Sequence, residues 1–200
     1  VVEAHAGRTI AFRLLDVQAS TRDRELRHQE RNPTLGLRGV RGLLSDRDLL
    51  RLQLRAVLRA ATGHDGVAVL VPFVTGLSDL QRVKAALLEE RVALKKAGVP
   101  CASELALAPI IEVPAAAMSL GSLLNESDFA VVAVDDLQAH LLAADRDNAA
   151  VREYHEMVHP AVFETLARMA RDAERREKQI VLFGESAADQ HEERAREALQ

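Results

Sequence analysis

The sequence is poor in aromatic residues. It contains no tryptophan, one tyrosine and five phenylalanines in 200 residues, although 48% of its residues are hydrophobic. We therefore expect an aliphatic core, built from leucine, valine, isoleucine and alanine. A chain of this length fits one ordinary domain and can bury a sizeable core.

Other absences narrow the class of protein. Cys101 is the only cysteine, which excludes an internal disulfide and favours a reducing compartment. The sequence has no apolar run of the ~18 residues that suggest a membrane span, and no visible signal peptide. Its formal net charge is −4 and its arginines are spread along the chain, which argues against a nucleic-acid partner. These features predict a cytoplasmic segment of a larger protein, with no membrane and no nucleic acid as its partner.

Five short apolar runs predict β-strands. They are mostly continuous rather than alternating, which is typical of strands covered on both faces in a parallel sheet. The runs are TIAFRLLDV from Thr9, GVAVLVPFV from Gly66, LALAPIIEV from Leu105, DFAVVAVDD from Asp128 and KQIVLFGES from Lys178.

Helical patterns lie between these runs. Leucines recur at three- and four-residue steps in residues 45–61, which predicts one apolar stripe on a helix. Residues 78–98 begin with a capping-box pattern at Ser78 and end at Gly98, a typical C-cap residue. Residues 159–178 predict a third helix.

Strands that alternate with helices predict repeated β-α units. Two α/β architectures compete, a doubly wound open sheet and a (β/α)8 TIM barrel. No GxGxxG or GxxxxGK[ST] follows the first run, which removes the main support for a nucleotide-binding open sheet. Barrel enzymes gather their functional side chains at the carboxyl ends of strands. Acids follow the runs at Asp16, Glu112, Asp135, Asp136 and Glu185, and we therefore predict the barrel.

Two of these acids suggest a metal site. Glu112 and Asp136 end neighbouring predicted strands, and Mg²⁺ commonly takes one or two carboxylates together with substrate phosphate. The alternative is that such acids are solvated or stabilise the N-terminus of the next helix.

Three arginines are candidate anion ligands. Arginine recognises phosphate and carboxylate through two parallel hydrogen bonds, and the candidates are Arg13 in the first apolar run, Arg38 in NPTLGLRGVR and Arg146 in LLAADRDN. Arg13 interrupts an apolar strand, where an unpaired cation is costly. The alternative role for Arg13 is a structural ion pair with Asp16 or Glu112.

Eight segments carry a family resemblance that runs in order from about Gly7 to Asp189. They are FRLLD, NPTLGLRGVR, LRLQLRAVLRAA, VLVPFV, IIEVPAAA, DFAVVAVDDLQAHLLAADRDN, HPAVF and LFGESAAD. Together they resemble the phosphoenolpyruvate-binding barrel of enzyme I of the bacterial sugar phosphotransferase system, a module shared with phosphoenolpyruvate synthase and pyruvate phosphate dikinase.

The resemblance implies roles for the candidate residues. The phosphate of phosphoenolpyruvate would be bound by Arg13, Arg38 and Arg146, and Mg²⁺ would be held by Glu112 and Asp136. It also implies partners, namely a phosphocarrier protein or a phosphorylatable histidine in another domain, and a homodimer. Relative to the family barrel, residues 1–200 would be one partial domain of about five β-α units, without the first strand and the last two.

The chain departs from the family pattern at several positions. Phe183 stands where the family has its proton-donating cysteine, so no catalytic residue is assigned. Asp135 replaces a substrate-binding asparagine and adds negative charge where phosphate should sit. The family's glycine-rich loop is replaced by QASTRDREL, in which Asp23 and Arg24 would stand in for its aspartate and lysine. Pro109 lies inside a predicted central strand, where it removes a hydrogen-bond donor.

We therefore predict a phosphoenolpyruvate-binding domain that transfers a phosphoryl group from phosphoenolpyruvate to a protein histidine, in sugar transport, with impaired catalysis. One alternative is a degenerate, non-catalytic module with a regulatory or interaction role. Another is a Mg²⁺-dependent lyase or aldolase of the 2-keto acid type, which uses a similar barrel.

Overall fold

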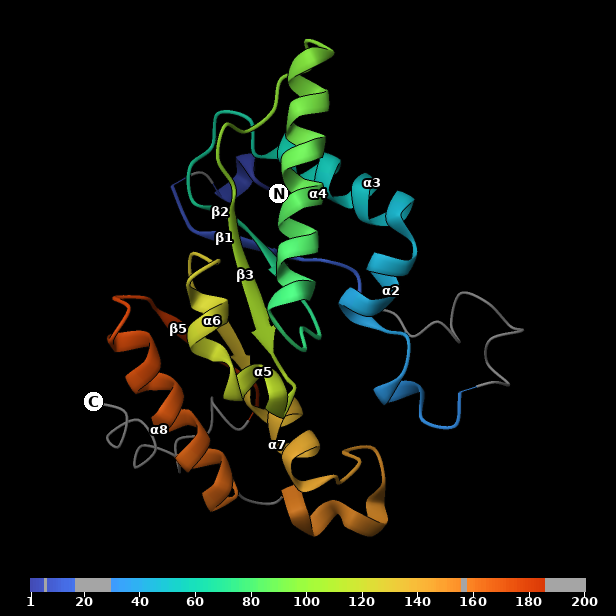
Figure 1. The fold of residues 1–200 in the computed structure, drawn as a ribbon, viewed down its shortest axis with the longest axis vertical. Coiled ribbons are helices and arrows are strands. Elements are labelled where there is room, and N and C mark those ends of the chain that lie inside the picture. The colour runs from blue at the N-terminus through green and yellow to red at the C-terminus, as the bar shows by residue number, and fades with distance from the viewer. Residues whose placement is uncertain (6, 17–29, 156–157, 186–200) are drawn as a thin grey trace. The chain divides into compact units, whose positions relative to one another are not determined.

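The computed structural model is an α/β protein and describes residues 1–5, 7–16, 30–155 and 158–185 (Figure 1). The loop residues Asp23 and Arg24 lie outside the described residues. In chain order the described elements, with 3-10 helices labelled η, are η1 (Glu3–His5), β1 (Ile10–Arg13), η3 (Pro33–Leu35), α2 (Gly39–Ser45), α3 (Arg47–Ala60), β2 (Val67–Val71), α4 (Leu77–Lys96), β3 (Ala106–Ile111), α5 (Pro114–Met118), α6 (Leu120–Leu124), β4 (Ala130–Ala133), α7 (Val134–Leu142), η4 (Ala149–His155), α8 (Pro160–Glu174) and β5 (Ile180–Phe183).

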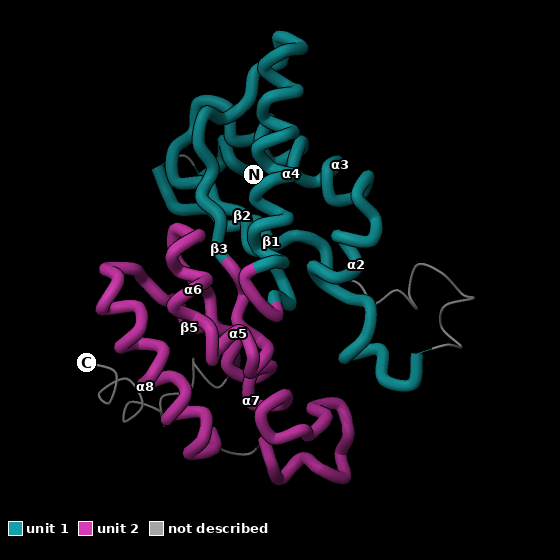
Figure 2. Tube along the Cα trace, in the orientation of Figure 1, with its two compact units in different colours: residues 1–74, 78–108 teal, residues 75–77, 109–200 magenta. Residues whose placement is uncertain are grey.

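The chain forms two compact units (Figure 2). Unit 1 comprises residues 1–74 and 78–108, and unit 2 comprises residues 75–77 and 109–200. Unit 1 therefore contains β1, β2, α2, α3 and nearly all of α4. Unit 2 contains β4, β5 and helices α5 to α8, and the boundary passes through β3.

The strands pair in parallel and in chain order within each unit. In unit 1, β1 pairs with β2, with Ile10 opposite Val67. In unit 2, β4 pairs with the second half of β3 on one side and with β5 on the other. A doubly wound sheet reverses its strand order, whereas a barrel keeps it. The fold class predicted from the sequence is confirmed, with five strands in the described residues where a complete (β/α)8 barrel has eight.

The predicted strands and helices are found close to their expected positions. Each of the five apolar runs contains one strand, and α3, α4 and α8 occupy the three predicted helical segments. The run from Asp128 is shorter as a strand than predicted. Strand β4 ends at Ala133, and α7 begins at the next residue, so Asp135 and Asp136 lie in the first turn of a helix.

Helix α3 shows why its pattern predicts a helix. Leu50, Leu54 and Leu58 recur every four residues and are buried. Asp46 precedes the helix, and its carboxylate accepts the Leu49 N–H at 3.0 Å, which caps the N-terminus. The opposite face of α3 carries arginines.

Two of these arginines clamp a buried acid on α4. Glu90 is fully buried, and its Oε1 accepts a hydrogen bond from Arg51 Nε at 2.5 Å. Its Oε2 accepts one from Arg55 Nε at 2.8 Å. Burial raises the pKa of Glu90, but the hydrogen bonds and charges of Arg51 and Arg55 outweigh it and leave this pKa lowered. Helices α3 and α4 are thus joined by a cluster of three charged side chains inside unit 1.

Helix α4 confirms one predicted end and corrects the other. Its C-terminus has Gly98 at φ +65°, with Val99 N–H donating to Leu94 O at 3.0 Å and Gly98 N–H donating to Lys95 O at 3.1 Å. This is the six-to-one and five-to-two pattern of a Schellman motif. Because the helix begins at Leu77, Ser78 lies inside it and is not its N-cap.

Unit 2 is built around α8. Proline begins this helix at Pro160, and the preceding His159 accepts the Ala161 N–H at 3.1 Å. Its buried side chains include Val162, Leu166 and Met169, and α8 packs against α5, α6 and α7. None of the helices in the described ranges has both the length and the hydropathy needed to cross a bilayer.

Strand β3 includes Pro109 despite the donor that this residue lacks. Pro109 is buried, and the registered pairs with β4 begin at the next residue, where Ile110 lies opposite Val131. The proline therefore does not interrupt the ladder between β3 and β4.

Candidate functional site

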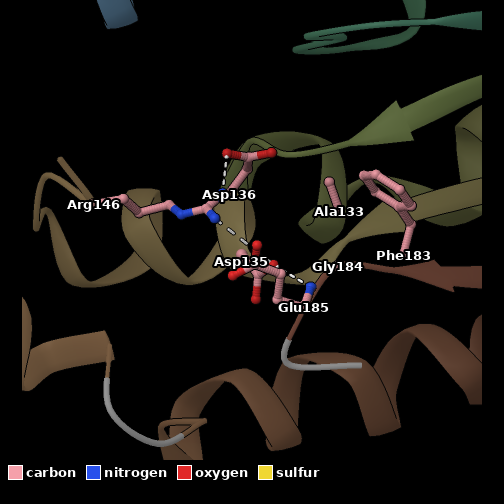
Figure 3. Close-up of a pocket in the computed structure, with 7 residues that line it drawn as sticks. All are labelled: Ala133, Asp135, Asp136, Arg146, Phe183, Gly184 and Glu185. Carbon is pink, nitrogen blue, oxygen red and sulfur yellow. Dashed lines mark hydrogen bonds and ion pairs between the residues drawn. The ribbon is translucent and has the colours of Figure 1, made fainter. Parts of the chain in front are cut away.

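A pocket of about 420 Å³ opens at the carboxyl ends of β4 and β5 in unit 2 (Figure 3). The register places Ala133 opposite Phe183, so the residues that follow these two strands meet at the same edge of the sheet. The pocket is lined by Ala133, Asp135, Asp136, Arg146, Phe183, Gly184 and Glu185.

Arg146 joins the two neighbouring acids of this pocket. Its Nη1 lies 3.1 Å from Asp136 Oδ1, and its Nη2 lies 3.9 Å from Asp135 Oδ2. Both acids lie in the first turn of α7, where the helix dipole favours negative charge. The structure therefore brings together a predicted phosphate-binding arginine, a predicted metal ligand and the residue at the predicted substrate-binding position.

Asp135 also fixes the segment after β5. Its Oδ2 accepts the Glu185 N–H at 2.8 Å. Gly184 has φ +146°, and a Cβ at this position would lie 2.6 Å from that same oxygen. The absence of a side chain at Gly184 thus allows the Asp135 carboxylate to approach the main chain.

Phe183 is the last residue of β5 and presents its ring to the pocket (Figure 3). Its exposed fraction is 62%, which is high for a phenylalanine. The ring carries no proton that can be exchanged near neutral pH. The position that the resemblance assigns to a proton donor therefore lines the pocket with an apolar, accessible side chain.

Glu112 lies at the same edge of the sheet but does not line this pocket. It follows the last residue of β3, is 3% exposed, and comes after Ile111, which pairs with Val132 of β4. His140 Nδ1 donates to the Glu112 carbonyl at 2.8 Å, which ties α7 to the end of β3.

The sequence does not predict a role for His140, because the seven histidines of the chain are scattered without metal-ligand spacing. Its position four residues after Asp136 on α7 is the signal that indicates a shared helix face. Glu185, which was noted only as an acid after a strand, also contributes to the pocket.

The described residues offer few ligands for a metal ion. Within the described ranges, no three His, Cys, Asp or Glu side chains gather as a metal site. The predicted pair supplies hard oxygen donors, Glu112 directly after β3 and Asp136 in the first turn of the helix that follows β4, which fits Mg²⁺ when substrate oxygens complete its coordination. The pair therefore stays a predicted metal site.

The other two predicted phosphate ligands lie in unit 1. Arg13 is the last residue of β1 and is exposed. Arg38 precedes α2 and forms a bidentate ion pair with Asp16, so the acid considered as a partner for Arg13 pairs with Arg38. The convergence of these arginines with Arg146 on one ligand stays a prediction.

The chain resembles curated phosphoenolpyruvate-protein phosphotransferases along nearly its whole length. It is 33% identical over 193 residues to the enzyme of Geobacillus stearothermophilus, covering 94% of this chain and 33% of that protein. It is 30% identical over 194 residues to the enzyme of Bacillus subtilis (strain 168), covering 95% of this chain and 33% of that protein. The chain thus spans about a third of the length of these relatives.

A solved structure of a citrate lyase from Burkholderia xenovorans LB400 superposes with a TM-score of 0.49 and 17% identity, over 68% of this chain and 40% of that one. Residues 1–195 match the sequence pattern of the family described as "PEP-utilising enzyme, PEP-binding domain", where PEP stands for phosphoenolpyruvate. The chain therefore belongs to the family of PEP-utilising enzymes and corresponds to their PEP-binding domain.

Proposed function

We propose that this chain binds PEP as the barrel portion of a phosphoenolpyruvate-protein phosphotransferase and takes part in phosphoryl transfer to a protein histidine. The observation that carries the proposal is the pocket in which Arg146, Asp136 and Asp135 meet at the ends of parallel strands. The proposal extends to a phosphocarrier protein or histidine domain as acceptor, a homodimer, and a cytoplasmic role in sugar transport. The name of the curated relatives supports phosphoryl transfer from PEP to a protein. The homodimer and the cytoplasmic role in sugar transport are implied by the family resemblance of the sequence segments alone.

The proposed roles follow from charge and position. Arg13, Arg38 and Arg146 would bind the phosphate of PEP, with Arg146 exchanging part of its contact with Asp136 for a phosphate oxygen. Glu112 and Asp136 would hold Mg²⁺, which neutralises phosphate charge when bound. Positioning and charge neutralisation account for most of the rate in phosphoryl transfer.

The proposed reaction has two parts. The bond between phosphorus and the enol oxygen of PEP breaks while a bond from phosphorus to a histidine nitrogen forms. The enolpyruvate left behind takes a proton at its methylene carbon and becomes pyruvate. Phe183 cannot give that proton, so we propose that the second part is slow in this chain.

A non-catalytic binding module is the second candidate function. Two features of the pocket favour it, namely the exposed Phe183 ring and the carboxylate of Asp135 beside Arg146. A module of this kind would still bind PEP without turning it over. Binding and turnover must therefore be measured separately.

Calorimetry tests the proposed function most directly. The full-length protein in its natural context should bind PEP more tightly with Mg²⁺ than without it. The changes Arg146→Ala and Glu112→Gln should each weaken Mg²⁺-dependent binding about tenfold or more, because each removes a charged ligand. Arg171→Ala, on the exposed part of α8, is the matched control and should leave binding unchanged. Absence of PEP binding by the unmodified protein would refute the proposal.

Replacing Asp135 with asparagine should strengthen PEP binding. We expect a gain of about five- to tenfold, since a like charge a few ångströms from phosphate costs on the order of 1 kcal/mol. The asparagine oxygen can still accept the Glu185 N–H, so the local structure is retained. Asp135→Ala separates charge from hydrogen bonding, and a weaker affinity of Asp135→Asn for PEP would contradict the assigned role.

A further inference from the structure

Arg38 is held by a nearly buried carboxylate. Its Nε donates to Asp16 Oδ1 at 3.1 Å and its Nη2 donates to Asp16 Oδ2 at 2.6 Å. The Asp16 side chain is 4% exposed and that of Arg38 is 20% exposed. Two parallel hydrogen bonds fix the plane of a guanidinium as well as its position.

The main chain that leads to Asp16 is anchored to the rest of unit 1. After β1, Leu14 N–H donates to Leu70 O at 2.9 Å and Leu15 N–H donates to Gln53 Oε1 at 2.7 Å. These contacts fix the segment that carries Asp16. The carboxylate is therefore presented to Arg38 by the sheet and by α3, not by a loop alone.

An aromatic ring lies against the same guanidinium. The Cζ of Arg38 is 4.7 Å from the centroid of Phe73, and Phe73 is 1% exposed. Gly39 allows this approach, because a Cβ there would lie 2.5 Å from the Phe73 Cβ. The cation–π contact and the ion pair together restrict the rotamers of a side chain that is otherwise flexible.

A second positive charge offsets the acid. The Cζ of Arg41 also lies 4.7 Å from the Phe73 centroid, so two guanidinium groups lie against this ring and one of them is paired with the Asp16 carboxylate. The formal charge of the three side chains is +1, which still favours an anion. These three side chains thus keep a net positive charge while Asp16 is paired with Arg38.

We propose that Asp16 is a positioning residue that holds the Arg38 guanidinium in the orientation required to bind the phosphate of PEP. The inference rests on the proposed function, in which Arg38 contacts phosphate. When the side chain is already oriented before the ligand arrives, less conformational entropy is lost on binding, and the entropic cost of binding is lower. The negative charge of Asp16 would weaken an anion site if it did not act through Arg38.

A double-mutant cycle on PEP affinity tests this inference. Asp16→Asn keeps the shape but presents an amide NH₂ to the guanidinium, and we expect it to weaken PEP binding about tenfold. In an Arg38→Ala background the same change should no longer weaken PEP binding and should strengthen it slightly, since there is no guanidinium left to orient and a negative charge is removed. Asp172→Asn, which alters an acid paired with Arg175 in unit 2, is the matched control. Additive effects of Asp16→Asn and Arg38→Ala would overturn the inference.

A spectroscopic readout separates this inference from the proposed function. In ligand-free protein the Arg38 Nε–H resonance, assigned by its loss in Arg38→Lys, should exchange slowly with solvent and should exchange faster in Asp16→Asn. Equal exchange in the two proteins would overturn the inference whether or not PEP binds. If the unmodified protein does not bind PEP, the proposed function fails, and this spectrum alone decides whether Asp16 holds Arg38.

Discussion

Phe183→Cys is expected to raise the formation of pyruvate from PEP by about 100-fold. General acid catalysis contributes roughly 10²–10⁴ in rate, and a thiol can supply the proton that the phenylalanine ring cannot. Phe183 lines the pocket and is largely exposed, so the replacement removes little from the core. The measurement is pyruvate released per protein at saturating PEP, with the phosphoacceptor present.

Two controls isolate the role of the thiol. Phe183→Ser opens the same space but introduces a hydroxyl, which is a far weaker acid near neutral pH. Incorporation of deuterium into the methyl group of pyruvate in heavy water should likewise increase for Phe183→Cys alone. An equal gain from serine would show that the ring blocks the pocket sterically. No gain from cysteine would argue for the non-catalytic binding module.

Glu90→Ala is expected to lower the free energy of unfolding by about 2 kcal/mol. Breaking a buried charged pair is costly, and the loss is moderated here because the arginine side chains are half exposed and can return to water. The measurement is urea unfolding at pH 7. Arg47→Ala/Arg59→Ala, which changes two exposed arginines on the same helix, is the control and should have little effect.

The pH dependence of the same pair has a defined sign. The pKa of Glu90 is lowered in the folded state, because hydrogen bonds from Arg51 and Arg55 outweigh the burial that raises it. The ionised Glu90 therefore makes its full contribution to stability above the ordinary pKa of glutamate, about 4.3. That contribution is lost as the pH falls through the lower pKa that Glu90 has in the folded protein. The difference in stability between the unmodified protein and Glu90→Gln should shrink over that acidic range.

Removing both arginines should reverse this trend. In Arg51→Ala/Arg55→Ala only burial acts on Glu90, so its pKa is expected to rise above the ordinary value. The variant should then gain stability relative to the unmodified protein as the pH falls toward that raised pKa. If the difference in unfolding free energy between this variant and the unmodified protein stays constant between pH 7 and pH 4, the charge of Glu90 does not contribute to stability.

Local patterns were sufficient to predict much of the fold. The continuous apolar runs predicted β1 to β5, and the spacing of Leu50, Leu54 and Leu58 predicted α3. Such patterns are reliable because burial on one face selects residues at a fixed period. The short helices α2, α5, α6 and α7 were not predicted, since helices of this length are stabilised by tertiary packing more than by their own sequence.

The candidate site was predicted less completely, for a different reason. Acids after strands pointed to Asp136, and family resemblance pointed to Arg146, and the two side chains do meet. The contacts of Asp16 with Arg38 and of His140 with Glu112 join residues 22 and 28 positions apart. Spacing along a single sequence does not reveal such partners, because they depend on how strands and helices are brought together.

Position 184 constrains which substitutions the pocket can accept. Any residue larger than glycine there would place its Cβ on the Asp135 carboxylate, at a φ value that other residues rarely adopt. The Asp135 carboxylate can therefore occupy its position only on a glycine background, and the φ value at 184 favours glycine whichever residue stands at 135. Loss of that glycine should reshape the pocket before any charge is altered. In a library randomised at both positions, survivors selected for PEP binding should keep glycine at 184 while residue 135 varies.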